Sequence, residues 1–299
     1  MEMMTRRKRK RNLLPVVLAV VLAVIVAALA LLVFRSLLPA AQREEPDPHA
    51  GQIYINDGAN MVWLTPHENF AVSPLHRWQF VTLEGQPWYV GSEFAVRRGV
   101  DLSVFQKNVD WAKAAESGVE FAVIRLGFRG YGKGALQPDD LFDSHLDGAH
   151  TAGIDAGVYF FSQALTAEEG REEAQYVLER LKGRKLELPV YFDWEPISAE
   201  DSRTNGYDYA NLTDSAVAFC QTIQAAGYQA GVYINRQQGY YHYDLSRLAD
   251  YSLWVADYNA YPDFYYRLDM WQYSANGQVD GFDIQVDQNL LFVPKNAVE

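Results

Sequence analysis

The segment Leu188-Pro-Val-Tyr-Phe-Asp-Trp-Glu-Pro196 decides how the rest of the chain is interpreted. Its apolar and aromatic residues predict a strand that ends in two carboxylates, Asp193 and Glu195, before a proline. Residues two apart on a strand point to the same face, with Cα atoms about 6.5–7 Å apart. Two acids on one face suit glycosidic bond cleavage, which needs a proton donor and a second carboxylate. An ordinary strand whose acids leave the core together has the same pattern, so the other segments have to distinguish the two interpretations.

From Arg98 onward, short β-rich segments alternate with helical segments. The expected strands are residues 99–102, 121–126, 156–161, 188–193, 230–234, 251–256, 268–273 and 282–286. The expected helices are residues 110–117, 140–152, 166–181 and 212–226. Alternating β and α segments predict a parallel sheet with right-handed crossovers. About eight strands in roughly 200 residues indicate a closed, TIM-like β/α barrel, here with helices missing near the C-terminus.

In such barrels the active site lies at the carboxyl ends of the strands, and acids follow several of the predicted strands. These acids are Asp101, Asp193, Glu195, Asp257 and Asp287. Like charges that meet at one mouth raise at least one pKa, which keeps a general acid protonated near neutral pH. Aromatic residues are expected to flank the acids as stacking surfaces for sugar rings, with core packing as the alternative for each. They are Tyr159, Phe161, Tyr233, Tyr258 and Trp271.

An uncharged run of 22 residues, Leu13 to Phe34, precedes all of this. As a helix it would be about 33 Å long, enough to cross a bilayer core. The basic cluster Arg6–Arg11 lies on its N-terminal side and places the N-terminus in the cytoplasm. A cleaved signal peptide is the rival interpretation, because Pro39-Ala-Ala41 supplies small residues after the run, but signal h-regions are only about 7–15 residues long. We expect an uncleaved single-pass anchor, with a secreted form if the segment is cleaved.

The charge of the chain is uneven. Seven of the 26 Lys/Arg residues and one of the 38 Asp/Glu residues lie within residues 1–35, so the remainder holds 19 basic and 37 acidic residues. An acidic body without a basic stripe argues against nucleic-acid binding. The lone Cys220 sits in an amphipathic helical pattern and is expected to be a buried thiol. No Cys/His spacing predicts a metal site, and no cofactor is expected.

Five segments result: a basic segment 1–12, a membrane helix 13–35, a stalk 36–50, a small β-rich module 51–95 and the barrel 96–299. The module has short apolar segments separated by turn signals, which predicts a β-meander. Its tryptophans, Trp63, Trp78 and Trp88, would form either a miniature core or a platform for a glycan or a protein partner.

The barrel segment resembles the lysozymes of glycoside hydrolase family 25, the N-acetylmuramidase type, in order from about Arg98 to Phe292. The segments that carry the resemblance are Arg98-Gly-Val-Asp-Leu-Ser103, Asp110-Trp111, Val123-Ile-Arg-Leu-Gly127, Gly157-Val-Tyr-Phe-Phe161, Asp193-Trp-Glu195, Gly231-Val-Tyr233, Leu253-Trp-Val-Ala-Asp-Tyr258, Trp271-Gln-Tyr273 and Val286-Asp287. The resemblance implies cleavage of the β-1,4 bond between N-acetylmuramic acid and N-acetylglucosamine in peptidoglycan glycan strands.

The resemblance also implies unequal roles for the acids. Glu195 would protonate the leaving oxygen and then activate water, while Asp193 would orient the 2-acetamido group of the substrate as it attacks the anomeric carbon. Asp101 and Asp287 would bind substrate and tune the acid, and Asp257 is a weaker candidate for the same site. One departure is Gln288, where the family often has an apolar residue.

Two alternatives remain open at this stage. A chitinase-like hexosaminidase would share the Asp193-Trp-Glu195 ending, although its signature has further Asp residues where this chain has Leu188 and Tyr191. A catalytically silent glycan-binding or scaffold protein would keep the barrel as a receptor, but it has no evident need for both acids.

Overall fold

The computed structural model describes residues 13–37 and 47–295, and the chain divides into two compact units, residues 1–50 and 51–299. The first unit contains one helix, α1 (Leu14–Leu37), of which no residue is buried. Its length and composition are sufficient to cross a membrane, although a signal sequence near an N-terminus passes the same test. The basic segment 1–12 and most of the predicted stalk lie outside the described residues.

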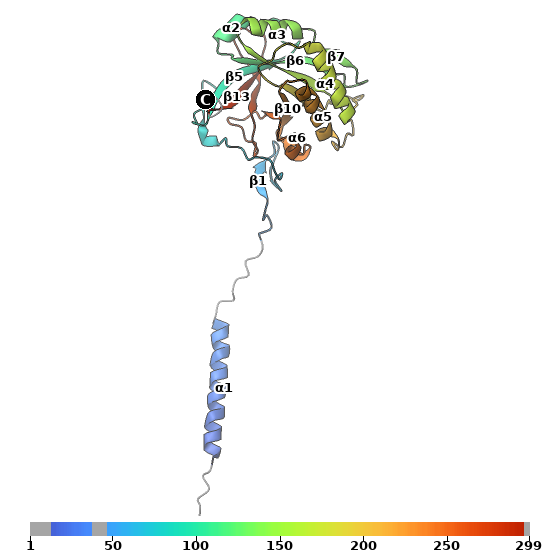
Figure 1. The fold of residues 1–299 in the computed structure, drawn as a ribbon. Helices are drawn as coiled ribbons and strands as arrows, with labels where there is room; N and C mark the ends of the chain where they lie inside the picture. The colour runs from blue at the N-terminus through green and yellow to red at the C-terminus, as the bar shows by residue number, and fades with distance from the viewer. Residues whose placement is uncertain (1–12, 38–46, 296–299) are drawn as a thin grey trace, which may run out of the picture. The chain divides into compact units, whose positions relative to one another are not determined.

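The second unit is built around a closed barrel (Figure 1). The strands of the ring are β5 (Phe94–Leu102), β6 (Phe121–Arg129), β8 (Asp155–Ser162), β9 (Val190–Trp194), β10 (Ala230–Asn235), β11 (Ser252–Ala256), β12 (Met270–Gly277) and β13 (Val286–Pro294). They lie in the order β5-β13-β12-β11-β10-β9-β8-β6, and pairing of β5 with β6 closes the ring. The short β7 (Leu136–Pro138) pairs with β6 outside it. The predicted TIM-like barrel is confirmed.

The helices cover the first part of the barrel and thin out towards the C-terminus. They are α2 (Trp111–Glu116), α3 (Phe142–Thr151), α4 (Ala167–Leu181), α5 (Leu212–Ala225) and α6 (Arg236–Tyr241), with 3-10 turns at Arg77–Gln79 and Leu245–Leu248. The Thr166 hydroxyl accepts a hydrogen bond from the Glu169 amide at the start of α4, as the capping-box spacing predicts. Within the described residues, no helix connects β11 to β12 or β12 to β13, which is where helices were expected to be missing.

One expectation about the sheet is wrong. The sheet was expected to be parallel throughout, but β13 runs antiparallel to both β12 and β5. Parallel neighbours need a crossover connection of a dozen or more residues, and the short link between β12 and β13 returns the chain directly instead. The residues expected to form a strand at 282–286 precede β13, and only Val286 belongs to it. Asp287 therefore lies at the start of a strand, and the antiparallel direction still brings it to the mouth formed by the carboxyl ends of the parallel strands.

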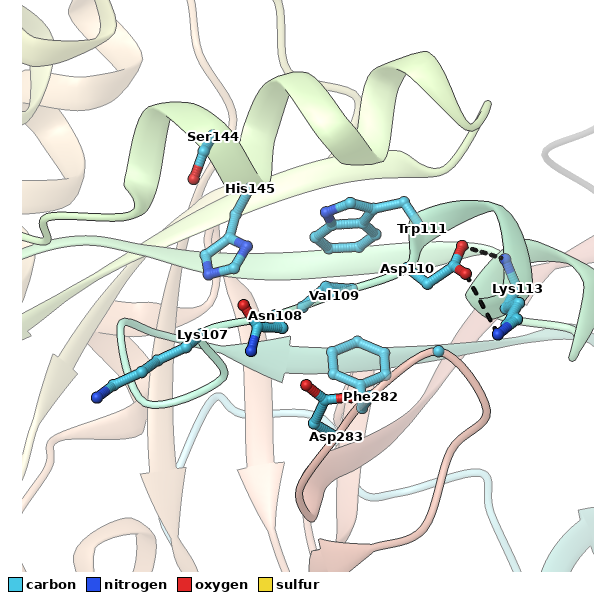
Figure 2. A pocket seen from close by; sticks show the side chains of 11 residues that line it. Lys107, Asn108, Val109, Asp110, Trp111, Lys113, Ser144, His145, Phe282 and Asp283 are labelled. Carbon is cyan, nitrogen blue, oxygen red and sulfur yellow. Dashed lines mark hydrogen bonds and ion pairs between the residues drawn. The ribbon is translucent and has the colours of Figure 1, made fainter.

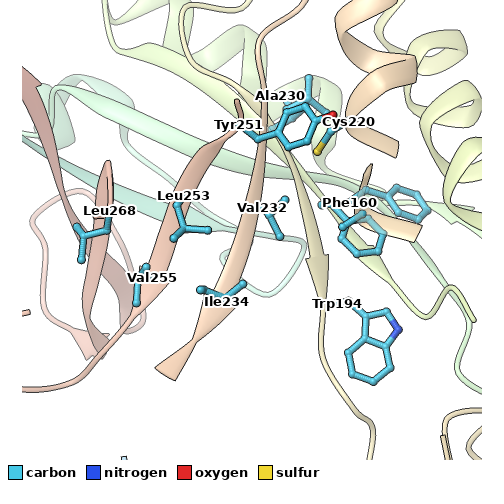
Figure 3. Packing of buried hydrophobic residues seen from close by; sticks show 14 of the residues in the cluster. Phe160, Trp194, Cys220, Ala230, Val232, Ile234, Tyr251, Leu253, Val255 and Leu268 are labelled. Carbon is cyan, nitrogen blue, oxygen red and sulfur yellow. The ribbon is translucent and has the colours of Figure 1, made fainter. Parts of the chain in front are cut away.

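The core has two parts, because residues alternate between the two faces of each strand. The outer part packs strand side chains such as Val232, Ile234 and Val255 against the helices (Figure 3). Cys220 belongs to it as a fully buried thiol whose Sγ lies 3.5 Å from the Gly231 carbonyl oxygen, which confirms the expected buried position. The inner part fills the barrel. Its buried members are Phe121, Val123, Leu188, Tyr191, Tyr233, Trp254, Ala256 and Met270.

The segment expected as one β-meander forms two separate hairpins. These are β1 (Ile53–Asn56) with β2 (Met61–Leu64) and β3 (Phe80–Leu83) with β4 (Gln86–Tyr89). The chain between them pairs with the segment before β12: the Ser73 amide donates to the Tyr265 carbonyl at 2.9 Å, and the Arg267 amide donates to the Ala71 carbonyl at 2.9 Å. This competing partner separates the two hairpins.

The hairpins have little core of their own. Phe80 and Tyr89 of the second hairpin pack edge-on against Phe292 of β13. The tryptophans Trp63, Trp78 and Trp88 stay 45%, 74% and 46% exposed, so they do not make the miniature core that was one of the two expectations for them.

Candidate active site

Four carboxylates from three strands meet at the mouth of the barrel. Asp193 is on β9, and Glu195 directly follows that strand. Both lie an even number of residues after Tyr191, whose side chain fills the inside of the barrel, so both are on the inner face. Asp101, near the end of β5, is the direct cross-strand partner of Asp287 at the start of β13. The structure thus brings together the four acids that were predicted to be catalytic.

A hydrogen-bond network holds Asp101. Its Oδ2 accepts from the Gln272 amide nitrogen at 2.8 Å and from the Asn289 amide nitrogen at 2.8 Å. Gln272 also reaches Asp287 Oδ2 at 3.5 Å, and the Trp254 indole donates to the Asn289 amide oxygen at 2.8 Å. Each partner is buried, so the position of Asp101 is fixed by groups that are themselves fixed.

Gln272 is the residue that joins this network to the aromatic side chains. Its amide oxygen accepts from the hydroxyls of Tyr233 at 3.1 Å and Tyr258 at 2.8 Å. Two hydroxyls on the oxygen leave the amide nitrogen directed at the carboxylates, which determines the orientation of the side chain. Gln272, Asn289 and Trp254 were not predicted as site residues. Their signal was available, because each lies an even number of residues from an inner-face position on its own strand.

Asp193 is a buried acid with an oxygen that has no hydrogen-bond donor among the described residues. It is 5% exposed, and that oxygen is Oδ1. The cation that acts on it is Arg125, whose Nε lies 2.8 Å from Asp139 and which lowers the pKa of Asp193 in opposition to burial. A buried carboxylate oxygen without a donor is costly in the free protein and is available to a donor on a ligand.

Burial and mutual repulsion raise the pKa values of all four acids. Burial, and then the negative charge of Glu195, raise the pKa of Asp193 well above its usual range. Burial and the charge of Asp101 also raise the pKa of Glu195. Burial raises the pKa of Asp101 to about 6 against the opposing hydrogen bonds from Asn289 and Gln272. Burial and the neighbouring Asp101 raise the pKa of Asp287 to about 8. A site of this kind holds protonated carboxyl groups at neutral pH, which is what a general acid requires.

The predicted stacking aromatics occupy different depths. Tyr258 is 57% exposed at the rim and Phe161, the register partner of Asp193, is partly exposed. Tyr159 is partly buried and meets Trp254 edge-on at 6.0 Å, whereas Tyr233 is only 6% exposed. Among these four residues, Tyr258 is the most exposed and Tyr233 the least.

Two predicted site residues point away from the mouth. Trp271 is fully buried on the outer face, where its ring meets Phe80 edge-on at 5.7 Å and its indole donates to the Asp257 carbonyl at 2.6 Å. The Asp257 carboxylate lies 3.5 Å from Arg236 Nε and accepts from the Asp263 amide at 2.6 Å. Both follow inner-face neighbours by one residue, and a shift of one position on a strand reverses the face.

A separate hollow of about 590 Å³ lies outside the acid cluster, beside α2 and α3 (Figure 2). Trp111, His145 and Phe282 line it, and Asp110 at its edge accepts from the Lys113 amide at the start of α2. None of the four mouth acids lines this hollow. Within the described residues, no group of three or more His, Cys, Asp or Glu side chains is arranged to hold a metal ion.

A β/α barrel with paired carboxylates at the mouth is the class of fold and site used for glycosidic bond hydrolysis. Residues 100–282 match the family described as glycosyl hydrolases family 25, and this chain belongs to that family.

Relatives and solved structures agree with the family. The autolytic lysozyme of Clostridium acetobutylicum is 26% identical over 192 residues, which cover 64% of this chain and 54% of that protein. Lysozyme M1 of Streptomyces globisporus is 26% identical over 204 residues, covering 64% of this chain and 66% of that protein. This chain thus spans between about half and two thirds of the length of these relatives.

Among solved structures, the modular autolysin LytC from Streptococcus pneumoniae aligns with a TM-score of 0.57 and 23% identity, over 71% of this chain and 51% of that one. A second structure of LytC is a complex with a synthetic peptidoglycan ligand. The bacterial lysozyme from Streptomyces coelicolor aligns with a TM-score of 0.53 and 22% identity, over 67% of this chain and 94% of that one. At these identities the likeness shows the fold.

Proposed function

We propose that this protein is a peptidoglycan hydrolase of the N-acetylmuramidase type, which cleaves the β-1,4 bond between N-acetylmuramic acid and N-acetylglucosamine. The observation that carries the proposal is the placement of Asp193 and Glu195 on one inner face, with Asp101 and Asp287 opposite them. The names of the lysozyme and autolysin relatives support the same substrate class.

Glu195 is the general acid in this proposal. Burial and the charge of Asp101 raise its pKa, which favours the protonated form that gives its proton to the glycosidic oxygen as the bond to the anomeric carbon breaks. The resulting carboxylate then takes a proton from the water that attacks the anomeric carbon, which returns the site to its starting state.

Asp193 orients the 2-acetamido group of the substrate, which acts as the nucleophile. The 2-acetamido oxygen attacks the anomeric carbon while the acetamido N–H donates to Asp193, whose Oδ1 lacks a donor in the free protein. Attack by the substrate makes a carboxylate nucleophile unnecessary, so the short carboxyl separation of about 5–5.5 Å seen in two-carboxylate retaining enzymes need not apply. Asp101 and Asp287 bind the sugar, and the negative charge of Asp101 raises the pKa of Glu195.

The test is mass analysis of the products from digested peptidoglycan, with chitin oligomers as a parallel substrate. The proposal expects saccharides with reducing N-acetylmuramic ends from peptidoglycan. Reducing N-acetylglucosamine ends, or cleavage of chitin oligomers alone, would identify a hexosaminidase instead. Binding to the wall without any bond cleavage would identify a glycan receptor.

Asp101→Asn is expected to move the basic limb of the pH–activity profile to lower pH. The negative charge of Asp101 raises the pKa of Glu195, so its removal makes the general acid lose its proton earlier as the pH rises. The profile is measured as kcat/KM against pH for both proteins. Asp155→Asn is the matched control, since Asp155 lies at the opposite end of the barrel, paired with Arg97 at 2.8 Å. If the basic limb does not move in Asp101→Asn, the charge of Asp101 does not control the pKa of the general acid.

We also propose that α1 anchors the protein in the membrane, with residues 51–299 on the outer side, facing the wall. Its length of 24 residues and its apolar composition support this proposal, together with the basic cluster before it in the sequence. The full chain should then stay in the membrane fraction after washing with high salt and alkaline carbonate. Recovery of a soluble form that begins after residue 37 would show cleavage instead.

A further inference from the structure

A cleft of about 680 Å³ lies between the first hairpin, the segment 72–77 and the loop 261–265. Its lining combines aromatic rings with polar groups, among them Tyr54, Asn56, Arg77, Tyr261, Asp263 and Phe264. Residues 54–77 precede the residues that match the family, so one wall of the cleft is an addition to the family barrel.

The added wall is held firmly in place. The Tyr241 hydroxyl of α6 donates to Asp57 Oδ2 at 2.8 Å, and Asp57 Oδ1 closes the hairpin turn by accepting from the Asn60 amide at 2.8 Å. The Asn56 amide nitrogen lies 3.4 Å from Asp263 Oδ2, across the cleft floor. Figure 1 shows β1 beside α6, on the side of the barrel where β10 ends. The wall of the cleft is therefore held in a defined position within the unit formed by residues 51–299.

One loop runs from the rim of the acid-lined mouth to the cleft. Tyr258, at the start of this loop, donates its hydroxyl to Gln272 in the site at 2.8 Å. Five residues later Asp263 lines the cleft, and Arg236 holds this loop in place, lying 3.5 Å from Asp257 and 3.4 Å from Asp263. The loop thus links the rim of the mouth at Tyr258 to the cleft.

We propose that the cleft is an additional saccharide subsite, which binds sugar units of the glycan strand beyond the bond that is cut. This inference rests on the proposed function. A pyranose presents an apolar face of C–H groups and a rim of hydroxyl and acetamido groups. The cleft offers both kinds of partner, ring faces at Tyr54 and Tyr261 and hydrogen-bonding groups at Asn56 and Asp263.

The aromatic rings have a suitable setting for stacking. Tyr54 is 54% exposed and is supported from behind by its cross-strand neighbour Trp63, with ring centroids 4.9 Å apart. Arg77 lies 5.7 Å from the centre of the Tyr261 ring and supports that ring in the same way. Rings that are already ordered lose little conformational freedom when a ligand binds. The charges at the cleft are mixed, Arg77 against Asp263, so neither sign dominates its lining.

The test is binding of peptide-free N-acetylglucosamine–N-acetylmuramic acid chains to the full-length Glu195→Gln protein in detergent, by titration calorimetry. A tetrasaccharide and a dodecasaccharide are compared. We expect the longer chain to bind about tenfold more tightly, a gain of the size that two aromatic contacts supply. Tyr54→Ala and Tyr261→Ala should each remove most of this gain and leave tetrasaccharide binding unchanged.

Two controls make the result specific. Tyr54→Phe keeps the ring and should keep the gain. Trp88→Ala removes a ring of similar exposure, 46%, from the second hairpin, where Trp88 packs on Arg98 at 4.3 Å, and should also keep it. A gain that survives in both Ala variants, or equal affinity of the parent for both chain lengths, would overturn the subsite. A protein partner as occupant would give this second result.

Failure of the proposed function has a different signature. In that case the parent protein releases no saccharides from peptidoglycan. If saccharides are released at rates that Tyr54→Ala and Tyr261→Ala leave unchanged on long and short chains alike, the function holds and the subsite is wrong.

Discussion

Glu195→Gln is expected to lower kcat for peptidoglycan hydrolysis by about 10²–10⁴-fold, because an amide cannot give a proton to the leaving oxygen. Gln has nearly the shape of Glu and keeps one acceptor oxygen, so substrate binding and KM should change little. Release of reducing ends from purified walls measures the effect, with the thermal unfolding transition as the check on folding.

The matched control is Glu179→Gln, which makes the same exchange on the exposed face of α4 and should leave kcat unchanged. If Glu195→Gln cleared cell walls as fast as the parent protein, Glu195 would not be the general acid. Asp193 would then be the next carboxyl to test, since burial raises its pKa well above the usual range as well.

Arg129→Met is expected to destabilise the barrel by about 3–5 kcal/mol, the cost of leaving a buried ion without its partner. Arg129 is 4% exposed and donates to Glu173 at 2.6 Å, and the Glu173 carboxyl, fully buried, also accepts from the Ser162 hydroxyl at 2.6 Å. Burial raises the pKa of Glu173 to about 7 even though Arg129 opposes the rise. Without Arg129 that pKa rises further.

The pH dependence of this variant has a definite sign. Glu173 titrates at about 4.3 in the unfolded chain, so its raised folded pKa makes stability fall as the pH rises through the interval from about 4.3 to above 7. Relative to the parent, the deficit of Arg129→Met should be nearly constant while Glu173 stays protonated in both folded proteins, and it should grow above about pH 7, where Glu173 ionises in the parent but not yet in the variant. Denaturant unfolding at a series of pH values measures it.

Two further variants separate ion-pair burial from simple loss of a side chain. Arg129→Met with Glu173→Leu removes both charges and should recover most of the lost stability. Arg247→Met breaks a surface pair, in which Arg247 Nη1 lies 2.7 Å from Asp214 and the side chains are 46% and 45% exposed, and should cost less than about 1 kcal/mol. Equal losses in the buried and surface variants would contradict this account.

The barrel was predictable because its signals are local. Short buried strands, amphipathic helices and the glycines that end them repeat along residues 99–256, and each element can be identified within its own segment. The direction of β13 was not predictable in this way. It depends on how the short link between β12 and β13 returns the chain, and a parallel and an antiparallel strand have the same residue pattern.

Some residues of the candidate site were also predictable from local sequence, and others were not. Asp193 and Glu195 were identified from a spacing of two residues, and Asp101 from its place after an apolar strand. Asp257 and Trp271 each follow an inner-face residue by one position, so their side chains leave the strand on the opposite face, which residue type near a strand end does not reveal. Strand alternation places Gln272 and Asn289 on the inner face, but their role in holding Asp101 depends on hydrogen-bond partners that only the folded structure shows.

The sequence by itself thus determined the class of fold, the apolar N-terminal helix and the pair of acids, because periodicity and spacing are properties of single segments. Only the tertiary structure decided which acids face one another, what holds Asp101 in place and that residues 53–77 wall a cleft beside the mouth. Those features join residues more than 150 positions apart, and closure of the barrel and the docking of the first hairpin are the steps that bring them into contact.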